Sequence, residues 1–152
     1  MFLVGDTPEV QANQIRTWLP NHASVALLVA ATYFEWTLCR VLIGLSTRPN
    51  MAVRHDLANV FGLPKYKDFW KSELSHLNDF RRLPEAVQDW NAVTEAFDAR
   101  NRLVHGRERY TRKMATPHVE NLLNAVAELR DYALKYGCDV AKRLPIRRKA
   151  RP

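Results

Sequence analysis

Three side chains suited to chemistry on an anionic group stand close together in the stretch Arg-Asn-Arg-Leu-Val-His-Gly, residues 100–106. His105 is the side-chain type best suited to proton transfer near neutral pH. Arg100 is suited to binding a phosphate through its planar set of N–H donors. Asn101 follows Arg100 directly and precedes His105 by four residues, so Asn101 and His105 share one face of a helix. Arg100, Asn101 and His105 are therefore the candidate catalytic residues.

The helix expected to carry these residues spans 85–105, with Pro84 in its first turn and Gly106 as its end. Apolar residues at helical spacing form one stripe along it: Ala86, Trp90, Val93, Phe97 and Val104. Arg100 and Asn101 flank this stripe. Arg100 and His105 lie about 140° apart on an ideal helix. They converge only if the helix loosens near Gly106 or if the long arginine reaches across.

Two interpretations of this polar interruption remain open. In the first, Arg100 pairs with a buried acid and His105 is a helix-end residue stabilised by the helix dipole. Glu35 is the expected acid, because it is the only acid in the most apolar segment of the chain. In the second, the stripe opens into a cleft or a subunit interface, where Arg100, Asn101 and His105 meet a ligand.

The surroundings of the stretch favour an anionic ligand. Tyr110 adds an aromatic ring that could stack on a base. The nearby acids are Asp98 and Glu108. Cations outnumber them within a dozen residues: Arg102, Arg107, Arg109, Arg112 and Lys113. Since basic clusters are also common as solvated faces, this observation is supporting evidence.

The net charge of +7 is concentrated at the C-terminal end of the 152-residue chain. Residues 141–152 hold six cations and no acid, which leaves 17 cations against 16 acids in the other 140 residues. We expect one domain over residues 1–140, long enough to bury a core, and a flexible basic tail over residues 141–152. The tail suits an acidic partner such as nucleic acid, but it could also be a solvated end.

The hydrophobic pattern predicts an all-α fold, an antiparallel bundle of four to five main helices. Helices are expected over residues 8–18, 21–45, 51–60, 67–80, 85–105 and from Thr116 to about residue 136, with Gly137 as the last stop. The first is capped by Asp6 or Thr7, and Pro64 helps to close the third. No segment shows the alternation that predicts strands.

Several classes of site and location are disfavoured by composition. Cys39 and Cys138 form neither a disulfide framework nor a metal motif, so a reducing compartment is expected. The five scattered histidines build no metal site, and no cofactor is expected. Residues 23–34 are apolar, but Glu35 and Arg40 interrupt the run, which predicts a buried helix and no membrane contact. No signal peptide is recognised, so we expect a cytoplasmic protein.

The stretch from Arg100 to Gly106 resembles the motif of HEPN-domain proteins, which has an arginine, a polar residue that is often asparagine, and a histidine a few residues later. Arg100, Asn101 and His105 fill these places, and the all-helical body over roughly residues 8–137 fits the same family. The resemblance implies a metal-independent endoribonuclease whose composite site lies at a homodimer interface. His105 would then transfer protons, Arg100 would hold the scissile phosphate, and Asn101 would orient either of them. The products would be a 2′,3′-cyclic phosphate and a 5′-hydroxyl.

The resemblance also implies partners and a biological role. From the basic and aromatic surroundings of the motif, we expect RNA to contact Arg102, Arg107, Arg109 and Tyr110, with Glu35 as the supporting acid. Family members often act as toxins or abortive-infection effectors in host defence, sometimes beside an antitoxin partner. One toxin subgroup has a tyrosine two residues after the histidine, where this chain has Arg107. Other HEPN domains lack nuclease activity, so the alternative is a non-catalytic helical module that binds RNA, nucleotide or a protein partner.

Overall fold

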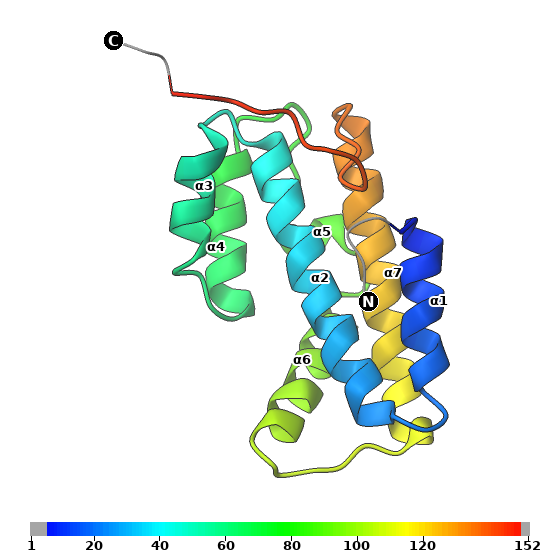
Figure 1. The fold of residues 1–152 in the computed structure, drawn as a ribbon. Coiled ribbons are helices and arrows are strands. Elements are labelled where there is room, and N and C mark those ends of the chain that lie inside the picture. The colour runs from blue at the N-terminus through cyan, green and yellow to red at the C-terminus, as the bar shows by residue number, and fades with distance from the viewer. Residues whose placement is uncertain (1–5, 150–152) are drawn as a thin grey trace. The chain divides into compact units, whose positions relative to one another are not determined.

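The computed structural model describes residues 6–149, and every regular element within this range is a helix. In chain order the helices are α1 (Pro8–Trp18), α2 (Ala23–Leu45), α3 (Asn50–Leu57), α4 (Leu63–Leu74), α5 (Leu83–Ala86), α6 (Trp90–Val104) and α7 (Arg112–Lys135) (Figure 1). The predicted all-α class is confirmed. The described residues form seven helices, of which α5 has only four residues, and the antiparallel bundle of four to five main helices stays a prediction.

The described residues form two compact units, and each is considered separately. The motif unit contains the described residues of Met1–Glu35 and Asp89–Ala127. The tail unit contains Trp36–Gln88 and the described residues of Glu128–Pro152. Two of the three dividing points fall inside α2 and α7, so each of these helices contributes to both units, and the third falls between α5 and α6. The single domain expected over residues 1–140 stays a prediction.

The motif unit is built from α1, α6 and the first parts of α2 and α7. The Thr7 hydroxyl caps α1 by accepting a hydrogen bond from the Val10 amide at 3.4 Å, as the sequence predicts. Arg16 of α1 forms a two-pronged ion pair with Glu120 of α7, with N–O distances of 2.8 and 2.9 Å. This ion pair joins α1 to the first part of α7, and the two helices lie side by side (Figure 1).

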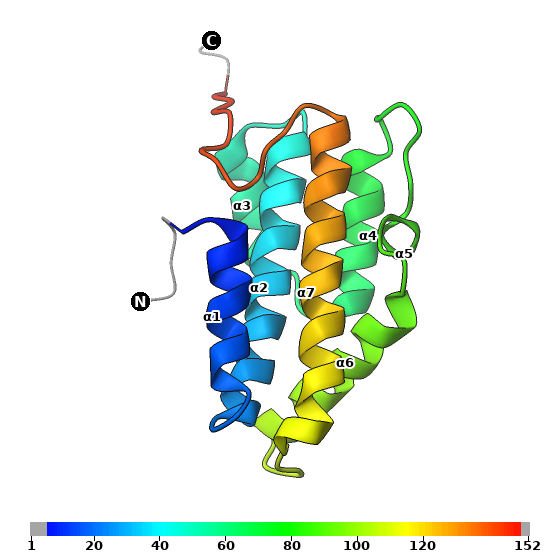
Figure 2. The same cartoon turned by 90° about the vertical axis from the view of Figure 1, so that its right-hand side faces the viewer.

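The tail unit is built around Trp70 of α4, whose side chain is fully buried. The Trp70 indole nitrogen donates to the Arg81 carbonyl at 2.9 Å, and the ring lies 5.3 Å from the Tyr132 ring of α7. Buried indole rings need such a partner for the N–H group. The segment after α7 runs past the last turn of α2 in both views (Figures 1 and 2).

Proline and glycine act differently around α4 from what was predicted. Pro64 was expected to close the preceding helix, but it lies in the first turn of α4, which begins at Leu63 and ends at Leu74. A proline is favourable there because the amides of the first turn have no intrahelical acceptor. Gly62 precedes the helix with a positive φ of 82°, a conformation that favours glycine.

The single helix predicted over residues 85–105 is wrong, since the chain forms α5 and α6 with a break between them. Val87 is extended (φ −116°, ψ 123°) and its side chain is buried. Asp89 then caps α6 by accepting a hydrogen bond from the Ala92 amide at 3.0 Å. Burial of an apolar side chain and a new N-cap together stabilise the break.

The last helix begins earlier than predicted. α7 starts at Arg112, Thr111 accepts a hydrogen bond from the Met114 amide at 3.4 Å, and Pro117 lies inside the helix. The helix was expected to open at Thr116, but the residue that precedes its first turn is Thr111. The glycines after α6 and α7, Gly106 and Gly137, have φ values of 65° and 74°, as expected of helix ends.

Helix α2 is, by length and composition, the one helix of the described range that could cross a membrane. An 18-residue stretch of α2 has a mean hydropathy of 1.5, and 61% of that stretch is buried inside the structure. A buried core helix of a globular protein has the same composition.

Candidate functional site

Helix α6 presents the candidate residues on its last turn and is anchored by its apolar stripe. Phe97 is buried, and its ring makes an edge-to-face contact with Phe34 of α2 at a centroid distance of 5.6 Å. Ala96 and Ala99 are fully buried on the same helix. The geometry of an edge-to-face pair is specific, so it fixes the rotation of α6 about its axis. That rotation decides where Arg100 and Asn101 point.

Arg100 is brought together with both of its expected neighbours. Its Nη1 donates to Asn101 Oδ1 at 3.0 Å, and its Nη2 lies 4.0 Å from Glu35 Oε2. The Arg100 and Glu35 side chains are 33% and 27% exposed, so the pair is neither deeply buried nor fully solvated. Burial raises the pKa of the Glu35 carboxyl, and the charge of Arg100 opposes this shift.

His105 stands at the end of α6, and its imidazole is exposed. Its backbone amide donates to the Asn101 carbonyl at 3.1 Å, while the Gly106 amide donates to the Leu103 carbonyl at 3.0 Å. Among residues 6–149 no side chain hydrogen-bonds or ion-pairs with the His105 imidazole. The helix remains regular up to Val104, so His105 is joined to Asn101 through the backbone alone.

The side chains of Arg102 and Tyr110 belong to one network on the loop after α6. Arg102 Nε donates to Glu108 Oε2 at 3.0 Å and lies 3.4 Å from the Tyr110 hydroxyl, which itself donates to Glu108 at 2.9 Å. Tyr110 is 7% exposed and its ring packs edge-on against His118. Stacking of a base on Tyr110 would therefore require the ring to leave this position. Arg107 and Arg109 are exposed.

Two residues of this network were missed as site components. Glu108 orders Arg102 and Tyr110, and it is the only acid between Arg100 and Glu120, a sequence signal that could have identified it. His118 faces Tyr110, and burial lowers the pKa of its imidazole. Nothing in the local sequence distinguishes His118, because its contact with Tyr110 is made only in the folded chain.

Two cavities of the tail unit are lined by residues other than the motif. One of about 330 Å³ is lined mainly by charged residues of the α5 region and α7, and a larger one lies beside α3. In the described part of the chain, no group of three or more His, Cys, Asp or Glu is arranged to hold a metal ion.

The chemistry that these groups could supply is proton transfer by His105 at the end of α6 and donation from the Arg100 guanidinium and the Asn101 amide in the helix before it. No family model, no curated protein and no solved structure matches this chain.

Proposed function

We propose that this protein is a metal-independent endoribonuclease that uses Arg100, Asn101 and His105. The observation that carries the proposal is an exposed imidazole at the end of α6, one helical turn after an arginine and an asparagine that are hydrogen-bonded to each other. The resemblance of residues 100–106 to the HEPN motif, in a chain whose described elements are all helical, supports the same function.

In the proposed reaction the RNA 2′-oxygen attacks the adjacent phosphorus while losing its proton to a base. The bond to the 5′-oxygen breaks, and that oxygen leaves as a hydroxyl after receiving a proton. The products are a 2′,3′-cyclic phosphate and a 5′-hydroxyl end. His105 performs one of the two proton transfers, and its exposure gives it access to the phosphodiester.

Arg100 binds the scissile phosphate and stabilises the charge that develops on it. A guanidinium has five N–H donors, and one of those on Arg100 is used by Asn101. Glu35 lies 4.0 Å from the other terminal nitrogen, so it orients the guanidinium without closing a short ion pair. Donors thus remain for phosphate oxygens.

A second copy of the chain completes the site in this proposal. A single motif supplies one imidazole, whereas the reaction needs a base and an acid. The apolar side chains of Val104, Met114 and Val25 are exposed in the motif unit, which suits association of two copies. Such a HEPN-like pair would act in the cytoplasm as a toxin or defence effector, with RNA and an antitoxin as partners. Arg102, Arg107 and Arg109 would contact the RNA backbone, with Tyr110 beside them.

A non-catalytic module that binds RNA, nucleotide or protein is the second candidate. The observation that favours it is the lack of any side chain that orients the His105 imidazole among residues 6–149. Catalytic histidines usually have an orienting partner. A binding module would retain RNA affinity in His105→Ala and cleave RNA in neither form.

The test is incubation of purified protein with mixed RNA in EDTA. We expect cleavage by the wild type and loss of at least about 100-fold in rate for His105→Ala and for Arg100→Ala, the effect of losing a proton-transfer or charge-stabilising group. His22→Ala is the matched control, because His22 is also exposed in the motif unit. Wild-type rates in His105→Ala would refute the assignment, and cleavage by no form would favour the binding module.

A further inference from the structure

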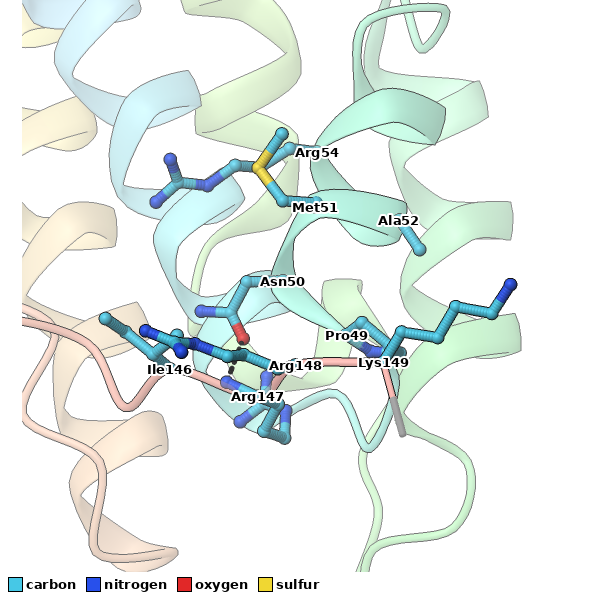
Figure 3. A pocket seen from close by; sticks show the side chains of 9 residues that line it. All are labelled: Pro49, Asn50, Met51, Ala52, Arg54, Ile146, Arg147, Arg148 and Lys149. Carbon is cyan, nitrogen blue, oxygen red and sulfur yellow. Dashed lines mark hydrogen bonds between the residues drawn. The ribbon is translucent and has the colours of Figure 1, made fainter. Parts of the chain in front are cut away.

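A groove in the tail unit lies between the first turn of α3 and the C-terminal segment. Its volume is about 540 Å³, within the range of ligand sites in proteins. Nine residues line it: Pro49, Asn50, Met51, Ala52, Arg54, Ile146, Arg147, Arg148 and Lys149 (Figure 3). None of the candidate nuclease residues is among them.

The two walls of the groove are fastened together by Asn50. Its side chain donates to the Pro145 carbonyl at 2.8 Å and accepts from the Arg147 amide at 2.9 Å, the bond drawn in Figure 3. The backbone amide of Asn50 donates to the backbone carbonyl of Arg147 at 3.2 Å. Asn50 is buried, so these bonds are shielded from water. The groove is therefore preformed, and a ligand would lose little affinity to ordering it.

Large apolar side chains are exposed on both walls. Met51 of α3 is 75% exposed, and Ile146 of the C-terminal segment is 57% exposed. Figure 3 shows Met51 and Arg54 extending from the same side of α3, as their spacing of three residues requires. An apolar strip bordered by polar groups is typical of a protein interaction site.

Every charged residue that lines the groove is a cation. Four of the nine lining residues are cations and none is an acid. Among the described residues, Arg54, Arg148 and Lys149 form no ion pair, whereas three other cations of the tail unit do. Arg48 pairs with Asp56, Arg82 with Glu85 and Lys142 with Asp139. A ligand that complements this groove would therefore carry anionic groups.

We propose that this groove binds an acidic, apolar segment of a protein partner. Apolar side chains of the segment contact Met51 and Ile146, while its carboxylates pair with Arg54, Arg148 and Lys149. A nucleic acid is also anionic, but single-stranded RNA is recognised by stacking of bases on aromatic rings, and no aromatic residue lines the groove. The apolar lining instead matches a peptide that carries leucine-like anchors.

The test is fluorescence polarisation with a labelled hexapeptide of alternating Asp and Leu and the full-length protein. Three further probes are compared with it. One peptide has Lys in place of Asp, a second has Ser in place of Leu, and the third probe is the RNA oligomer hexauridylate. We expect the Asp-Leu peptide to bind best. Met51→Ser and Arg54→Glu should each weaken binding at least about fivefold, the loss typical of an interface hot spot. Arg143→Glu, an equal change of charge in the same segment but outside the groove, should change it less than about twofold.

Equal weakening by Arg143→Glu and Arg54→Glu would reduce the effect to net charge and overturn the proposal. Tighter binding of hexauridylate at this groove would assign it to nucleic acid and overturn the proposal as well. Ile146→Ser probes the opposite wall if Met51→Ser fails to fold, and circular dichroism reports folding. In the wild type, the peptide should slow amide exchange of residues 50–54, and unchanged exchange would contradict binding there.

Discussion

Arg147 should stabilise the tail unit far more than the other cations of the C-terminal segment. Its guanidinium donates to the carbonyls of Ile43, Gly44 and Arg48, with distances of 3.3 Å to Gly44 and 3.1 Å to Arg48. The Ile43 and Gly44 carbonyls belong to the last turn of α2, where helix carbonyls lack an intrahelical donor. A cation there also complements the negative end of the helix dipole.

The magnitude follows from these three bonds. A hydrogen bond from a charged donor contributes about 1.5–3 kcal/mol, and we take the lower value because Arg147 is half-buried. Three such bonds contribute about 4.5 kcal/mol, and ordering the arginine side chain opposes this by about 2 kcal/mol. Arg147→Ala should thus lower the free energy of unfolding by about 2–3 kcal/mol.

Urea denaturation followed by circular dichroism measures this loss. Arg148→Ala is the matched control, since Arg148 is the adjacent, exposed arginine and should change stability by less than about 0.5 kcal/mol. Arg147→Lys keeps the charge but not the planar donors, so its stability should lie between Arg147→Ala and the wild type. Equal stability of Arg147→Ala and Arg148→Ala would refute the reasoning.

Three further predictions concern packing and pH. Phe97→Ala should cost about 3–5 kcal/mol of unfolding free energy through the cavity it leaves, whereas the exposed Phe61→Ala should cost little, as paired denaturation curves can check. A Cβ on Gly44 would lie 2.5 Å from the Cys138 sulfur, so Gly44→Ala should lower the free energy of unfolding by about 1–3 kcal/mol. Adding Cys138→Ala removes the sulfur and should recover much of the lost stability. Additive losses in the double mutant would contradict this clash. The raised pKa of Glu35 means that the folded state binds more protons than the unfolded state above about pH 4. The stabilisation that protonated Glu35 contributes is therefore present below the pKa that its carboxyl has in the unfolded chain, and it is lost as pH rises through the pKa in the folded chain. Thermal melts across the acidic pH range should show this loss of stability in the wild type and not in Glu35→Gln.

The tail shows where a prediction from composition meets its limit. The six cations of residues 141–152 suggested a flexible, basic segment, and Arg151 lies outside the described residues. Arg147 and Arg148 are adjacent and chemically identical, and both line the groove, yet only Arg147 is half-buried and donates to carbonyls at the end of α2. The flexibility of residues 141–152 and their contact with nucleic acid stay predictions.

The sequence by itself determined most helices and the place of the candidate site on them. The Thr7 cap, the end of α6 at Gly106 and the apolar stripe that buries Phe97 depend on residues within one or two turns of each other. Short-range rules of capping and periodicity therefore identify them. The adjacency of Arg100 and Asn101 and the place of His105 at the helix end follow in the same way.

Only the tertiary structure decided which polar groups are satisfied and which remain exposed. The 4.0 Å separation of Arg100 from Glu35 and the binding of Arg147 to α2 join residues distant in sequence, and the burial of Tyr110 against His118 joins the loop before α7 to α7 itself. The break at Val87 likewise depends on what that side chain can be buried against. Such outcomes are set by packing between elements, where burial and hydrogen bonding outweigh the local preferences of the chain.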